Sequence, residues 1–310
     1  MPKPTFSLFL PQVAMSYDML RERALLAESL GFDGLWLVDH MWPRGMPDLD
    51  QLEAWTSIAA LAEATNTIRL GVLVTCNSYR NPGILAKCVT TADHVSGGRI
   101  ELGIGAGWMD EEYRAYGFEF PPIRTRLEQL DEALAILTSL FSEQRTTAKG
   151  KHYVFEDAPF NPKPVQKPLP ITIGGGGKRV LMKQVARYAT RWNCPMTVVS
   201  DMQGHRDALA EHCARIGRDP EEIIISEQTC VIVGRDADDY ATKRQIAKAM
   251  VGGWIDLKTM AVGGTPDQVI EGLRKKMAAG VTDFAIVFGD MGMPDTLELF
   301  MTEVAPKLGA

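Results

Sequence analysis

The segment ITIGGGGKR, residues 171–179, joins a β-branched apolar run to four glycines and a basic pair that opens a helical pattern. Its polar half consists of Gly174, Gly175, Gly176, Gly177, Lys178 and Arg179. Glycine lets a ligand approach the backbone closely, and a helix that follows directs unpaired N–H groups and its positive dipole end into the bend. Such a turn can bind phosphate. A tight glycine turn without any ligand is the alternative.

Asp39 and His40 follow directly after the apolar run GLWLV, residues 34–38. A histidine there can donate or accept a proton near neutral pH, above all if a carboxylate holds its other ring nitrogen. The alternative is that His40 only ends a strand and hydrogen-bonds locally. The remaining histidines fall on predicted helices or loops, and no metal-ligand spacing meets at the strand ends, so we predict no metal site.

The turn GIGAGW, residues 103–108, would allow a planar ligand to lie against the backbone at Ala106 and Gly107, although glycines needed for packing are nearly as good an explanation. The acidic turn at residues 110–113 fits a solvated surface. Trp42, Trp108 and Tyr116 could wall an aromatic pocket or belong to the core or rim. The chain has no GxSxG motif, so acyl-transfer hydrolysis is unsupported. A turn that can bind phosphate, a histidine at a strand end and room for a planar ligand against glycine backbone together indicate a ring cofactor that carries a phosphate group.

Eight short apolar runs alternate with helical patterns along the chain, which predicts a parallel sheet covered by helices. The expected strands are residues 6–10, 34–38, 68–75, 99–107, 171–174, 191–193, 222–233 and 283–288. We predict an α/β protein, a (β/α)8 TIM barrel in one domain over residues 1–310, with an insertion between strands 4 and 5. The insertion is the proline-rich stretch 145–170, which could hold a small hairpin. A doubly wound sheet is disfavoured because the first strand ends in Pro11 and Gln12, without a glycine-rich loop.

In such a barrel the active site lies at the carboxyl ends of the strands. This rule selects Gln12, Asp39, His40, Thr75, Cys76, Asn77, the 105–108 turn, the glycine run, Asn193, Gln228, Gly289 and Asp290.

Composition restricts the classes of partner. The 310 residues carry a net charge of −6, which argues against nucleic-acid binding. No apolar run is long enough for a membrane span, and the N-terminus has no secretory pattern. The five cysteines are scattered and odd in number. They indicate reduced thiols in a cytoplasmic protein.

Several segments together resemble the luciferase-like monooxygenase superfamily, in particular its branch of coenzyme F420-dependent oxidoreductases. The matching segments span nearly the whole chain and are residues 32–43, 69–87, 97–121, 170–193 and 264–284. The resemblance implies a barrel that holds a flavin-like ring in its mouth and the phosphate tail near the glycine run. It also implies a non-prolyl cis peptide behind the ring, which by position falls at Val72–Leu73.

The Asp39-His40 pair matches members that use coenzyme F420, so His40 is the candidate catalytic residue, as a proton donor or a ring-positioning group. Trp108 stands where sugar-phosphate dehydrogenases of this branch place a glutamate, which favours a more apolar substrate. The expected cofactor-binding residues are Asp39, His40, Val72, Leu73, Thr75, Ala106, Gly107, Gly174, Gly175, Gly176, Gly177, Lys178, Arg179 and Asn193.

The resulting hypothesis is an F420-dependent oxidoreductase that transfers a hydride between the deazaflavin and a small, apolar organic substrate. The alternative is an FMN-dependent monooxygenase that uses externally reduced flavin and oxygen. A cofactor-binding or storage protein without turnover is a third hypothesis, against which the histidine at the mouth speaks. We expect a small-molecule substrate, no nucleic-acid or membrane partner and, from the resemblance only, a homodimer.

Overall fold

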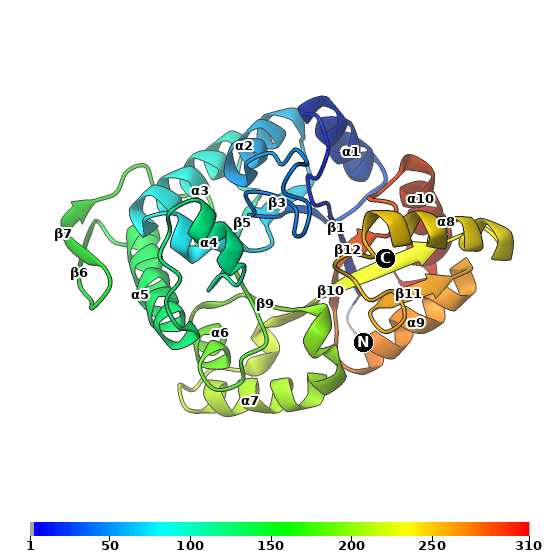
Figure 1. The fold of residues 1–310 in the computed structure, drawn as a ribbon. Coiled ribbons are helices and arrows are strands. Elements are labelled where there is room, and N and C mark those ends of the chain that lie inside the picture. Colours follow the sequence, from blue (N-terminus) through cyan, green and yellow to red (C-terminus); the bar gives the residue numbers. More distant parts are fainter. Residues whose placement is uncertain (1–2, 310) are drawn as a thin grey trace.

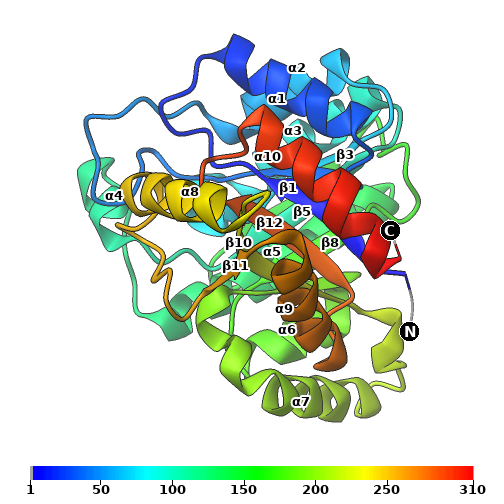
Figure 2. The same cartoon turned by 90° about the vertical axis from the view of Figure 1, so that its right-hand side faces the viewer.

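Eight parallel strands close into a barrel with helices on its outside (Figures 1 and 2) in the computed structural model, which describes residues 3–309. Around the barrel the strands follow the order β1, β2, β3, β5, β8, β9, β10, β12 and back to β1. Their bounds are β1 Thr5–Phe9, β2 Gly34–Leu37, β3 Arg69–Val72, β5 Ile100–Gly105, β8 Ile171–Gly174, β9 Arg191–Cys194, β10 Ile224–Val233 and β12 Asp283–Phe288. The predicted TIM barrel is confirmed.

The helices alternate with the strands along the chain, and the last of them follows β12. They are α1 Tyr17–Ser29, α2 Ala54–Ala64, α3 Pro82–Ser96, α4 Asp110–Ala115, α5 Ile123–Ser142, α6 Leu181–Tyr188, α7 Met202–Ala214, α8 Ala237–Met250, α9 Pro266–Ala278 and α10 Pro294–Leu299. Local sequence signals account for several of their starts. Asn81 caps α3, with Pro82 in its first turn, and Thr265 with Gln268 forms a capping box at α9. No helix within residues 3–309 is both long and apolar enough to cross a bilayer.

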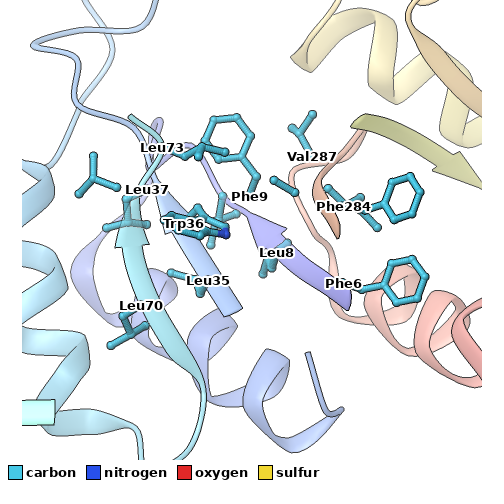
Figure 3. Close-up of a cluster of buried hydrophobic side chains, with 14 of the residues drawn as sticks. Phe6, Leu8, Phe9, Leu35, Trp36, Leu37, Leu70, Leu73, Phe284 and Val287 are labelled. Carbon is cyan, nitrogen blue, oxygen red and sulfur yellow. The ribbon is translucent and has the colours of Figure 1, made fainter. Parts of the chain in front are cut away.

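Aromatic and aliphatic side chains from both faces of the strands form the core, part of which Figure 3 shows around β1, β2 and β12. The rings of Phe6 and Phe284 stack with their centroids 5.6 Å apart, and Phe300 meets Phe6 edge-on at 5.4 Å. All three side chains are fully buried. Such pairs stabilise a fold beyond the area that they bury, and here they join the first and last strands of the barrel to the C-terminal helical segment.

Two short strands leave the barrel pattern between α5 and β8. β6, Arg145–Lys149, pairs antiparallel with β7, Val154–Pro159. This hairpin stands at the left edge of the molecule beyond α5 (Figure 1), so the hairpin expected within residues 145–170 is present. A further strand that the sequence did not predict, β11 Ala261–Gly264, pairs parallel with β10.

The third strand departs from the prediction. The sequence predicts a strand through residues 68–75, but β3 ends at Val72, and the two-residue strand β4, Thr75–Cys76, pairs with β5 instead. The non-prolyl cis peptide predicted at Val72–Leu73 lies one residue later, between Leu73 and Val74. The regular ladder with β2 continues as far as the N–H of Leu73, which donates to the carbonyl of Leu37 at 2.8 Å, so the backbone changes course only after that residue.

The helix after the glycine run also begins later than predicted. The sequence predicts it over residues 178–189, but α6 begins at Leu181. The carbonyl of Gly177 accepts from the N–H of Met182, five residues on, so a turn wider than an α-helical one precedes the helix. Lys178 and Arg179 therefore belong to the loop.

Candidate active site at the mouth of the barrel

His40 lies just beyond the carboxyl end of β2, and a carboxylate from α4 holds it. Its Nδ1 is 2.9 Å from Oε2 of Glu112. The same Oε2 accepts from the hydroxyl of Tyr79 at 2.6 Å, while Oε1 accepts from the backbone N–H of Met41 at 2.6 Å. The Glu112 side chain is fully buried, and that of His40 is 25% exposed. A partly open imidazole is thus fixed by a buried carboxylate.

Burial alone would raise the pKa of Glu112, but hydrogen bonds from His40, Tyr79 and the Met41 N–H outweigh it and place this pKa below its usual 4.5. Glu112 is therefore an acceptor-only carboxylate at neutral pH. Burial and the hydrogen bond to Glu112 raise the pKa of Tyr79, which therefore stays a donor.

The role of Glu112 was not predicted from the sequence, in which residues 110–113 are interpreted as a solvated turn. That interpretation is wrong for half of the turn, because Glu112 and Tyr113 are both fully buried. One signal was available: together with buried Met109 they occupy positions i, i+3 and i+4 of a helix, which share one face.

Asp39 does not hold the neighbouring histidine. Its two carboxylate oxygens accept from the guanidinium of Arg80 at 2.7 and 2.8 Å, and one also accepts from the N–H of Cys76 at 2.8 Å. Arg80 in turn pairs with Glu53. Asp39 therefore ties the end of β2 to β4 and to the segment after it.

Five further expected positions lie around the ends of β3, β4 and β5. Val72 and Thr75 are fully buried, and the Thr75 hydroxyl accepts from the indole of Trp55 at 3.1 Å. Gly107 has φ +75°, and an added Cβ would overlap the hydroxyl of Tyr113. That hydroxyl is also 3.1 Å from Sγ of Cys76. The turn after β5 is therefore packed directly on α4, while Leu73 is nearly buried and Ala106 is half-buried beside Gly107.

The four glycines divide into two kinds. Gly174 ends β8, and a Cβ there would lie 2.8 Å from Cγ1 of Val74, so its role in the fold is to make room for that side chain. Gly175 has φ +138° and begins the loop. The carbonyl of Gly175 accepts from the indole N–H of Trp192 at 2.8 Å, and that of Gly176 lies 2.8 Å from Nε2 of His205.

The loop offers a row of backbone donors. Among residues 3–309, no acceptor is found for the N–H groups of Gly176, Gly177, Lys178 and Arg179. Lys178 forms an ion pair with Asp201, and the Arg179 side chain is exposed. Asn193 is buried on β9, where its amide donates to the hydroxyl of Ser226 at 3.1 Å. Successive unpaired amides form an anion-binding concavity, so the loop fits a phosphate group.

Aromatic side chains come from the segments that follow His40 and β5 in the chain. The ring of Trp108 meets the imidazole edge-on, with centroids 5.4 Å apart, and the guanidinium of Arg44 lies 5.1 Å from the Trp108 ring. Trp42 stacks on Tyr116 at 5.7 Å. Trp108 and Tyr116 are each more than half exposed. The exposed ring of Trp108 therefore provides apolar surface next to the imidazole.

Most of the predicted site residues lie on or directly after elements that are neighbours in the structure. β5 and β8 pair directly, so the Gly107 turn and the glycine loop follow adjacent strands. Glu112 and Trp108, which follow β5, both contact His40.

Gln12 and Asp290 have other partners. Gln12 bonds to backbone groups of Val38 and Leu52, and Asp290 accepts from Thr296 at the start of α10. Within the described residues, no group of three or more His, Cys, Asp or Glu side chains is placed to hold a metal ion.

Comparisons with known proteins agree with this architecture. The family model described as luciferase-like monooxygenase matches residues 5–254. An F420-dependent glucose-6-phosphate dehydrogenase of Amycolatopsis mediterranei (strain U-32) is 32% identical over 173 residues, 56% of this chain and 50% of that protein. The chain thus spans about half the length of that curated relative. A 5,10-methylenetetrahydromethanopterin reductase of Methanolobus tindarius is 27% identical over 271 residues, 87% of this chain and 75% of that protein.

Two solved structures share the fold over almost the whole chain. An F420-dependent secondary alcohol dehydrogenase in complex with an F420–acetone adduct has a TM-score of 0.86 at 21% identity, covering 99% of this chain and 100% of that one. Monooxygenase RslO1 from Streptomyces bottropensis has a TM-score of 0.79 at 22% identity, covering 98% and 99%. The family model covers well over half of the sequence, and the chain therefore belongs to the luciferase-like monooxygenase family.

Proposed function

We propose that this protein is a coenzyme F420-dependent oxidoreductase that transfers a hydride between the deazaflavin and a small, apolar organic substrate. One observation carries the proposal. Nε2 of His40 has no partner among the described residues, while Nδ1 is held by a buried carboxylate. A fixed imidazole with one free nitrogen at the mouth of a barrel is suited to proton transfer. The names of the curated relatives favour F420 as the cofactor.

The bound cofactor would supply the hydride chemistry, and the protein the orientation and the proton. In the oxidation of an alcohol, the carbon loses a hydride and the hydroxyl proton passes to Nε2 of His40, which leaves a carbonyl. In the opposite direction His40 returns that proton to the oxygen. His40 is therefore the proposed catalytic residue.

The loop at residues 175–179 is the proposed anchor of the cofactor's phosphate. Its N–H groups at Gly176 to Arg179 are unpaired within the described residues, and the carbonyls of Gly175 and Gly176 are held from behind by Trp192 and His205. Donors that are already positioned lose little freedom when an anion binds.

An apolar substrate is favoured by the surface next to His40. Trp108 exposes more than half of its area there, and aromatic surface of this kind gains free energy when a ligand covers it.

An FMN-dependent monooxygenase is the second candidate, because FMN also offers a phosphate to the loop and a monooxygenase shares the fold. Titration of the purified protein with F420 and, separately, with FMN, followed by cofactor fluorescence, tests the choice. We expect saturable binding of F420 and much weaker binding of FMN. Tight binding of FMN with no response to F420 would reverse the assignment, and binding of neither would remove the cofactor proposal.

His40→Ala tests the proton transfer. The variant should bind F420 as well as the wild type but lose about 10²- to 10⁴-fold in turnover. His94→Ala is the control, since His94 is exposed on α3 and its ring bonds to the carbonyl of Lys163. Unchanged turnover in His40→Ala would remove its role.

A further inference from the structure

We propose that Glu112 fixes the tautomer of His40, so that the proton of the neutral ring resides on Nδ1 and the lone pair on Nε2. Glu112 is then a positioning residue for the proton transfer. The inference adds a positioning residue to the proposed function, and its catalytic purpose rests on that function. The contacts among the three side chains do not depend on a cofactor.

The hydrogen bonds of Glu112 leave one consistent assignment. Its Oε2 faces both Nδ1 of His40 and the hydroxyl of Tyr79. An ionised carboxylate only accepts hydrogen bonds, so both partners must donate. A neutral imidazole has one N–H, and the contact with Glu112 requires that it be the one on Nδ1. The nitrogen left as an acceptor is Nε2, which has no partner among residues 3–309.

The second carboxylate oxygen fixes the backbone around the histidine. Oε1 accepts from the N–H of Met41 at 2.6 Å and faces the N–H of Trp42 at 3.4 Å. The segment directly after His40 is thereby bound to the same group that orients its ring. Tyr79 is itself held between Phe118, stacked at 5.0 Å, and Tyr113 at 5.2 Å, so the donor to Glu112 has a fixed position.

This arrangement has a chemical consequence. When Nε2 accepts a proton, the ring becomes an imidazolium whose positive charge lies 2.9 Å from the Glu112 carboxylate. A buried opposite charge at this distance stabilises the protonated ring. The carboxylate of a Ser-His-Asp triad acts in this way, since it holds the distal nitrogen of the catalytic histidine in one tautomer and stabilises the imidazolium that forms. Glu112 would therefore help His40 to accept a proton, and it would stabilise the protonated ring until His40 returns that proton.

Nitrogen NMR on the cofactor-free protein tests the inference without any turnover. Long-range ¹H–¹⁵N spectra of ¹⁵N-labelled protein distinguish the two neutral tautomers, and the His40 signals are identified by their loss in His40→Ala. At a pH where the ring is neutral, the wild type should show protonated Nδ1 and unprotonated Nε2. A wild-type ring with its proton on Nε2 would overturn the proposal, whether or not the protein binds F420.

Variants then separate Glu112 from a general effect of charge. In Glu112→Gln the amide can donate or accept, so the single-tautomer signature should be lost. Glu111→Gln removes an exposed carboxylate from the same helix and should leave the spectrum unchanged. Tyr79→Phe removes one donor but keeps the ring, so the Nδ1–H tautomer should persist. If Glu112→Gln fails to fold, the tautomer measured in the wild-type protein still tests the proposal. An unaltered tautomer in a folded Glu112→Gln protein would contradict the role of Glu112.

Discussion

Trp192 and His205 stack nearly parallel, with ring centroids 5.5 Å apart and an angle of 19° between their planes. The indole bonds to the carbonyl of Gly175 and the imidazole to that of Gly176. Both side chains are buried. One aromatic pair therefore holds two consecutive carbonyls of the glycine loop, and no acceptor within residues 3–309 is found for the N–H groups of Gly176 to Arg179.

Loss of either bond should loosen the loop and weaken cofactor binding. Trp192→Phe keeps an aromatic ring but leaves the carbonyl of Gly175 without its indole donor. His205→Phe likewise keeps a ring but removes the contact with the carbonyl of Gly176, together with one to the carbonyl of Asp201. A hydrogen bond contributes about 1 kcal/mol, so we expect each variant to bind the phosphate-bearing cofactor about fivefold more weakly. Isothermal titration calorimetry measures the change, with His94→Phe as the control outside the loop. Equal affinities in all four proteins would contradict this role of the stack.

Gly176 tests whether the shape of the loop is needed for binding. A Cβ at this position would lie 2.5 Å from Cγ1 of Val198, so Gly176→Ala must displace the loop or the valine. We expect at least a tenfold loss of cofactor affinity, equivalent to about 1.4 kcal/mol. Val198→Ala in the same protein removes the obstructing methyl group and should restore most of the binding.

Gly177→Ala is the matched control for this experiment, because its Cβ would meet Leu181 at an ordinary 3.4 Å. It should leave the fold and most of the affinity intact. If Gly176→Ala binds as tightly as the wild type, the loop geometry does not determine the affinity.

The close approach of Gly107 to Tyr113 predicts that substitutions at these two positions have coupled effects on the free energy of unfolding. An alanine at position 107 would be strained by φ +75°, and its Cβ would overlap the tyrosine hydroxyl. Overpacking and backbone strain together should lower the free energy of unfolding by about 3 kcal/mol. In a Tyr113→Phe background the added loss should be smaller, because the obstructing oxygen is gone.

Gly117→Ala separates the two causes of that loss. Gly117 has nearly the same φ, +73°, but nothing lies within 4 Å of its Cβ, so this variant carries the strain alone. It should cost about 1 kcal/mol. Urea unfolding of the single and double variants measures all of these values. Equal losses in Gly107→Ala and Gly117→Ala would show that Tyr113 plays no part.

Much of the barrel could be predicted because its signals are local. Apolar runs of four to six residues define the strands, and pairs such as Asn81 with Pro82 mark helix starts. The glycine loop could be found because its composition is unusual. The start of α6 could not, since the helical pattern continues back to Lys178 while the backbone there still makes a wider turn.

The partner of His40 could not be predicted because tertiary structure determines it. Glu112 lies 72 residues from His40 and 33 from Tyr79 along the chain. The carboxylate beside His40 in sequence, Asp39, bonds instead to Arg80. Closeness in sequence therefore does not identify the carboxylate that holds the imidazole.

The lowered pKa of Glu112 predicts how stability depends on acid. A carboxyl whose pKa is lower in the folded than in the unfolded state stabilises the fold fully above the unfolded value, here about 4.5, and loses that contribution as the pH falls through the folded value. Glu112→Gln lacks a group that titrates. The difference in unfolding free energy between wild type and Glu112→Gln should therefore be largest at neutral pH and shrink between about pH 5 and pH 3.

Urea unfolding across this range gives the measurement, with Glu111→Gln as the control on the exposed face of α4. The Glu111→Gln difference should stay small at every pH, because its carboxylate is solvated and exposed charges contribute little to stability. A Glu112→Gln difference that stays constant down to pH 3 would mean that the carboxylate gains nothing from His40 and Tyr79 in the folded protein. Since the hydrogen bond with His40 is also what orients the imidazole, the same result would weaken the assignment of Glu112 as its positioning group.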